Sequence, residues 1–249
     1  MSRKSNSFAG FPPKALTFFR QLAAHNDRDW FAANRKTYVE SVETPMLELV
    51  AAVGESIRSF AADYVREPKK QLYRIYRDTR FSRDKTPYKT HLGAQYQHPQ
   101  ITKNSGAGFY FHLGAKELCI AGGIYMPGPD ELKALRSAFC ADSKPFRKLI
   151  ANMSLTKAFG KPTTTSFARV PRQFSPDDPA ADLLKLKQIY FYVDLDPKLA
   201  LTPRVTSEIV KHFKLLSPMI HYINNTIVAA ARGEEDEASS TPRRPKPMF

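Results

Sequence analysis

Hydrophobic residues recur with helical spacing in the first quarter of the chain. After the prolines at 12 and 13, Leu16, Phe19 and Leu22 share one face of a predicted helix. Asn26 or Asp27 is placed to cap a second helix. The first quarter is therefore expected to be helical.

A third helix has the clearest signal. Thr44 is the expected N-cap, and Pro45 follows at the first helical position, where proline is favoured. Its apolar stripe consists of Met46, Leu49, Val50, Val53, Ile57 and Phe60. This stripe is predicted to face the core.

The hydrophobic period then changes from 3.6 to 2. The alternation predicts strands over residues 72–81, 90–97, 108–113 and 118–126. The short turn at residues 114–117 suits a hairpin, so this part of the sheet is expected to be antiparallel.

The remainder of the chain returns to helices and ends the sheet with one more strand. Residues 129–158 have helical spacing, and residues 162–179, rich in Pro, Thr and Asp, predict a long surface connection. Residues 188–195 alternate like a strand, and a closing helix is expected over residues 207–231.

Together these elements predict an α+β fold, with a largely antiparallel sheet of about five strands packed with N-terminal and C-terminal helices. Residues 1–11 are expected to be a flexible N-terminus and residues 12–231 a single domain. Residues 232–249 are low in apolar content, which predicts a disordered tail.

Charge adds a functional expectation to this fold. The 249 residues include 38 Lys and Arg against 24 Asp and Glu, a formal net charge of +14. Such a charge favours anionic partners: nucleic acid, phosphorylated small molecules or an acidic membrane surface. Residues 66–91 carry nine basic and three acidic groups, which is nearly half of the whole excess.

Other features narrow the class of protein. The two cysteines, Cys119 and Cys140, have no C-x-x-C spacing, and the sequence begins without a secretory signal, which predicts a cytoplasmic protein. Because no apolar run reaches 18 residues, membrane association is not expected. A glycine-rich phosphate loop is absent, and no cofactor is identified. Whether the protein is an enzyme stays open, because no nucleophile–base pair is visible.

Four sequence motifs point to a family. The longest runs from Arg74 to His91 and is dense in Arg, Asp and Lys. The others are Asn26–Phe31 with Asn34, Gly122–Gly123 with Met126–Pro127, and Asp182–Leu184 with Lys187. In these motifs the chain resembles the conserved hypothetical proteins of the domain of unknown function 2461, from about Phe11 to Ile227. The resemblance implies a shared fold and brings no established activity.

The first interpretation of the basic segment is an anion site. On a strand over residues 72–81, Arg77 would share the apolar face with Ile75 and Phe81, where an unpaired buried guanidinium costs about 3–5 kcal/mol and so requires a partner or a ligand. The expected ligand is small, anionic and phosphorylated. The candidate ligand-binding residues are Arg74, Arg77, Asp78, Arg80, Arg83, Asp84, Lys85, Tyr88, Lys89, Trp30 and Tyr125.

The second interpretation is an ion-pair lattice, in which Asp78 and Asp84 hold basic neighbours and fix the loop without a ligand. Nucleic-acid binding through the same basic patch, or docking of an acidic protein partner, are further alternatives. His91 and His112 on neighbouring strands could hold a metal with a carboxylate, but hydrogen-bonded sheet histidines are the simpler interpretation, and no metal site is predicted.

Overall fold

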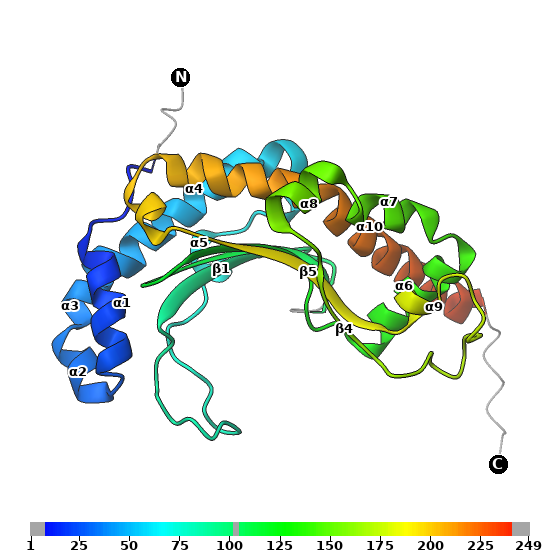
Figure 1. Ribbon diagram of the computed structural model, residues 1–249, viewed down its shortest axis with the longest axis horizontal. Helices are drawn as coiled ribbons and strands as arrows, with labels where there is room; N and C mark the ends of the chain where they lie inside the picture. The colour runs from blue at the N-terminus through cyan, green and yellow to red at the C-terminus, as the bar shows by residue number, and fades with distance from the viewer. Residues whose placement is uncertain (1–7, 102–104, 241–249) are drawn as a thin grey trace, which may run out of the picture.

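The computed structural model describes residues 8–101 and 105–240 (Figure 1). Three short helices stand at one end: α1 (Lys14–Ala24), α2 (Arg28–Ala33) and α3 (Arg35–Tyr38). Asp27 caps α2, because its carboxylate accepts a hydrogen bond from the backbone N–H of Trp30. The predicted cap of the second helix is therefore confirmed.

The π-helical turn η1 (Val39–Glu43) leads directly into α4 (Thr44–Ala61). Thr44 has helical dihedral angles, φ −62° and ψ −50°, so it lies inside a continuous helical run and is not an N-cap. The apolar stripe of α4 is confirmed: its predicted residues from Met46 to Ile57 are buried, and Phe60 is partly buried against the core.

Five antiparallel strands form one sheet in the order β1-β2-β3-β5-β4. They are β1 (His91–Gln97), β2 (Gly108–Gly114), β3 (Leu118–Ile124), β4 (Thr163–Ser166) and β5 (Leu186–Leu195). The backbone N–H of Gly114 donates to the carbonyl of Glu117 at 2.9 Å, which closes the predicted hairpin. The predicted α+β class with a five-stranded antiparallel sheet is confirmed.

One predicted strand is wrong and one strand was not predicted. Residues 72–81 do not form a strand; with the residues that follow they form a projecting segment, residues 72–90, which we call the arm (Figure 1, the long teal loop below the sheet). Its only β-pairings among the described residues are isolated bridges from Leu72 to Ala94 and from Tyr76 to Tyr88. The fifth strand is β4, within the predicted surface connection.

Helices of the second half cover the sheet together with α4 (Figure 1). They include α6 (Pro129–Ala141), α7 (Lys144–Ile150), α8 (Met153–Phe159) and α10 (Arg204–Ser240). The short elements are η2 (Ala62–Tyr64), α5 (Pro68–Gln71), α9 (Ala181–Leu184) and η3 (Pro197–Leu201). No helix of the described part is long and apolar enough to cross a membrane.

Helix α10 is longer than predicted and continues beyond Ala231 to Ser240; the rest of the predicted tail, residues 241–249, lies outside the described residues. Pro218 lies inside α10, and Figure 1 shows the helix bending along the curved sheet. At the other end of the chain, Phe8 and Phe11 are buried, and Phe11 N–H donates to the carbonyl of Ala200 at 2.8 Å. Residues 8–11 therefore belong to the body, although a flexible segment was predicted through residue 11.

The core lies between the helices and one face of the sheet. Phe213 of α10 packs on the rings of Tyr96, Phe109 and Phe111. Gly122 allows this approach, because a Cβ there would lie 2.9 Å from a methyl carbon of Leu216. Alternate side chains of the same strands point to the opposite face, which we call the open face.

Candidate functional site

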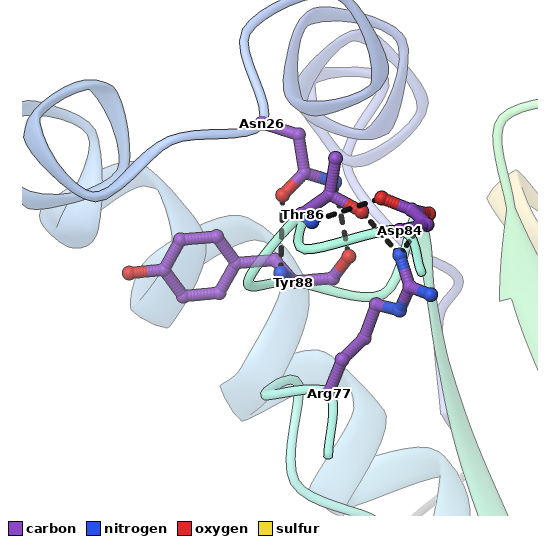
Figure 2. A network of polar contacts seen from close by, with 5 residues as sticks. All are labelled: Asn26, Arg77, Asp84, Thr86 and Tyr88. Carbon is purple, nitrogen blue, oxygen red and sulfur yellow. Dashed lines mark hydrogen bonds and ion pairs between the residues drawn. The ribbon is translucent and has the colours of Figure 1, made fainter. Parts of the chain in front are cut away.

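The outer part of the arm is braced by its own polar groups (Figure 2). The Arg77 guanidinium donates to the carboxylate of Asp84 and to the hydroxyl of Thr86. Asn26, in the loop before α2, accepts from the N–H of Tyr88 at 3.0 Å and donates to its carbonyl at 2.9 Å. These contacts fix the arm to the N-terminal helices.

The apolar face predicted for Arg77 does not exist. Ile75 is buried, but Phe81 is 95% exposed and the Arg77 side chain is 26% exposed. The prediction failed because residues 72–81 are not a strand, so the alternation of side chains does not continue to the end of the segment.

A second ion pair compensates the charge at the tip. Arg80 donates to both carboxylate oxygens of Asp78, at 3.0 and 2.7 Å. The hydrogen bond from Arg80 lowers the pKa of Asp78 to about 2, and the pKa of Asp84 falls to about 2 because it accepts from the Thr86 N–H and from Arg77. Lys85 donates to the carbonyl of Thr79 at 2.9 Å. The tip therefore has the geometry of the ion-pair lattice.

The base of the arm is different, because its cations form no ion pair with the described residues, although Asp78 is near enough to Arg74 for their charges to attract. Lys89 donates to the backbone carbonyl of Arg74 at 3.1 Å, and its ammonium lies 5.2 Å from the ring centroid of Tyr73. Burial and the nearby Arg74 guanidinium lower the pKa of Lys89. Among the described residues, Arg74 and Lys89 form no ion pair, and neither does the exposed Arg83 near the tip.

The open face of the sheet lies on the side of the arm. Strand register places its side chains in cross-strand rows. One row contains Gly93, His112, Cys119 and Asp194. The neighbouring row contains Gln95, Tyr110, Ala121 and Tyr192. The rows bring polar residues of three consecutive strands together with Asp194 and Tyr192 of β5, which comes more than sixty residues later.

Hydrogen bonds connect these rows to the arm. Tyr73 donates to Gln95. The Nδ1 atom of His112 lies 3.1 Å from the Tyr110 hydroxyl, and its Nε2 atom lies 3.2 Å from a carboxylate oxygen of Glu117. The network holds the tyrosine and histidine rings in a fixed arrangement.

Burial lowers the pKa of both histidines on this face. The rings of His91 and His112 lie 4.3 Å apart, and each pKa is lowered to about 4, so both are neutral at pH 7. Burial and a hydrogen bond with Asp194 raise the pKa of Cys119, which keeps its thiol protonated and poorly nucleophilic. In the described part of the chain, no three His, Cys, Asp or Glu side chains are grouped to hold a metal ion.

The three aromatic candidates occupy different places. Tyr88 is buried and stacks on Phe31 with ring centroids 4.1 Å apart, so its contacts are those of a core residue. Trp30 packs on Phe18 and is 6.1 Å from the ring of His25. Tyr125 is 59% exposed after β3 and contacts Tyr190, on the open face.

A family model described as "Conserved hypothetical protein (DUF2461)" matches residues 14–222. The chain belongs to this family. No curated protein matches the chain. The DUF2461 match spans the arm and every strand of the sheet, and its description names no activity.

Several motif residues of this DUF2461 chain make structural contacts. Asp182 accepts two hydrogen bonds from Arg147, at 2.9 and 2.5 Å, and ties α9 to α7. Asn26 holds the arm through hydrogen bonds with the Tyr88 backbone, and Gly122 leaves space for Leu216 of α10 to pack on the sheet. The fold therefore accounts for part of the motif pattern, whereas the Arg74 guanidinium makes no hydrogen bond or ion pair with the described residues.

Sequence reasoning did not select the tyrosines and carboxylates of the open face. Tyr110, Glu117, Tyr190, Tyr192 and Asp194 were not among the candidate residues. Except for Glu117 in the hairpin turn, these residues lie at alternate positions of predicted strands, but the pairing of β3 with β5, about sixty residues later, was not visible in the sequence.

Proposed function

We propose that the protein binds a phosphate-bearing ligand at the base of the arm, between the cations of Arg74 and Lys89 and the open face of the sheet. The observation that carries the proposal is that Arg74 and Lys89 lie side by side, with the Lys89 ammonium 3.1 Å from the Arg74 carbonyl, and that neither forms an ion pair among the described residues. Burial and the nearby Arg74 guanidinium lower the pKa of Lys89, and an anion bound between the two cations would offset both effects.

The neighbouring groups supply hydrogen bonds of the kind that such a ligand uses. The Tyr73 hydroxyl, which donates to Gln95, can still accept a hydrogen bond, and the neutral His91 has one ring donor and one acceptor. Both ring nitrogens of His112 are already engaged by Tyr110 and Glu117. Arg80 and Arg77 are excluded from the direct contact, because their guanidinium groups are already paired with carboxylates of the arm.

The test is thermal unfolding with inorganic phosphate, sugar phosphates, nucleotides and carboxylates. A ligand that binds only the folded state at a hundredfold excess over Kd adds about 2.7 kcal/mol of stability. We expect Arg74→Gln and Lys89→Gln to lose this gain while unfolding like the wild type without ligand. Arg80→Gln is the matched control and should keep it. The proposal fails if no phosphate compound stabilises the wild type, or if Arg80→Gln loses as much as Arg74→Gln.

A further inference from the structure

Five tyrosines lie in a line that begins at the base of the arm and crosses the open face. We call it the tyrosine stripe, and its members in spatial order are Tyr73, Tyr110, Tyr192, Tyr190 and Tyr125. Tyr73 and Tyr110 have ring centroids 6.1 Å apart. Tyr192 and Tyr190 are 6.2 Å apart, and Tyr190 and Tyr125 are 5.3 Å apart.

A small residue separates the two halves of the stripe. Tyr110 pairs with Ala121, and Ala121 pairs with Tyr192, so the three lie in one row across β2, β3 and β5. The methyl group of Ala121 is too short to cover either ring. The rings become more accessible away from the arm: Tyr110 is half-buried, while Tyr192 is 47% and Tyr125 is 59% exposed.

Charge is distributed unevenly around the stripe. Lys89 lies over the Tyr73 ring at one end and donates to the backbone carbonyl of Arg74, whose guanidinium is near enough to act on the Lys89 charge. Asp194 belongs to the neighbouring row, and Glu117, in the hairpin turn, contacts His112 of that row and lies near Tyr110, so carboxylates border the stripe while its own members are uncharged tyrosines. Cations at one end and uncovered aromatic rings along the remainder match a ligand with both phosphates and planar rings.

We propose that this ligand is a single-stranded nucleic acid, whose bases stack on the tyrosine stripe and whose phosphates contact Arg74 and Lys89. The inference rests on the proposed function and names the ligand class of that same site. A single strand fits better than a duplex, because paired bases are stacked inside the helix and present no free face to a tyrosine. A polymer fits better than one nucleotide, because β1 to β5 span three strand spacings, roughly 15 Å.

Fluorescence anisotropy with a labelled single strand of about twelve nucleotides tests the proposal. We expect Tyr192→Ala to weaken binding about tenfold or more, and Tyr192→Phe to bind like the wild type because it keeps the ring. Phe167→Ala is the matched control: Phe167 is also an exposed aromatic residue, but it packs under Arg136 and Lys187, off the stripe. It should not change the affinity, and the melting temperature of each variant verifies its folding.

The salt dependence of binding tests the phosphate contacts, and competition experiments test the preference for a single strand. Two phosphate contacts predict that log K falls with log salt with a slope of about −1.4, and Arg74→Gln should reduce that slope by about 0.7. A duplex of the same sequence and a mononucleotide should each compete at least about tenfold less well than the single strand.

Three results would overturn the inference: no binding of the single strand, equal affinity for the duplex, or equal effects of Tyr192→Ala and Phe167→Ala. If any of these occurs while Arg74→Gln still abolishes stabilisation by phosphate, the proposed function stands and the nucleic-acid inference falls. Binding that is lost in Tyr192→Ala but is unchanged in Arg74→Gln and Lys89→Gln overturns the proposed function and leaves the stripe as the site.

Discussion

The sheet and the arm come from segments with the same alternation of side chains, yet they are stabilised in different ways. Strands β1, β2 and β3 pair with neighbours along their whole length and bury one face under α10 and α4, where Tyr96 donates to the Val50 carbonyl. The arm has isolated bridges and is held mainly by Arg77, Asp84, Thr86 and Asn26. Alternation therefore describes which side chains share a side, while a strand also needs a neighbouring backbone and a surface to cover it.

The largest loss of stability is expected from a substitution on the face of the sheet that the helices cover. Phe111→Ala removes a ring that is fully buried against Phe213, so we expect the free energy of unfolding to fall by about 3–5 kcal/mol. Denaturant unfolding followed by circular dichroism measures this change. A loss below about 1 kcal/mol would contradict the assignment of this face as the core.

The two histidines of the open face should make the stability of the protein depend on pH. The pKa values of His91 and His112 are about 4 in the folded protein against 6.5 in a model peptide, so between these values the unfolded chain binds more protons. Stability should therefore fall as the pH falls from about 6.5 to 4, by at most about 1.4 kcal/mol per pH unit for each histidine.

The matched variant is the double substitution His91→Gln and His112→Gln, measured by denaturant unfolding between pH 7 and pH 5. We expect a shallower pH dependence than in the wild type. An identical slope in the two proteins would contradict the lowered pKa values of these two histidines.

In the arm, one substitution should have a local effect. Arg77→Gln removes the charge that holds Asp84 and weakens the contact with Thr86, so the arm should open more often while the sheet is unchanged. We expect cleavage within residues 78–86 by a protease to accelerate several-fold, with a melting temperature near that of the wild type. Loss of the whole fold would mean that the arm is part of the core.

The smallest effect is expected at the tip of the arm. Phe81→Ala is the same chemical change as Phe111→Ala, but the ring is 95% exposed, so stability should change by no more than about 0.5 kcal/mol. The ratio of the two effects measures how strongly the sheet and the arm differ. A substantial loss would place Phe81 in a contact with the body.

The fold class was predictable because the strongest signals are long and periodic: the α4 stripe, three consecutive strands and the closing helix. β4 was missed because Thr163–Ser166 contains only Thr and Ser, and this exposed edge strand has no apolar alternation. The arm was misread because Ile75 and Phe81 alternate with arginines in the sequence although only Ile75 is buried. The charge of the candidate site was predictable. The sequence spacing did not show which cations pair with Asp78 and Asp84, because that depends on how the arm folds.

The position of α10 in the chain has a consequence for biosynthesis. This helix contacts α4, β2, β3, α6, α7 and α8, and its buried residues extend from Val205 to Ile227. A ribosome makes α4 and the first three strands long before it makes this cover, so the apolar face of the nascent sheet stays accessible until those residues emerge. Chaperone binding during translation is therefore expected to be strongest on chains that end between β3 and α10.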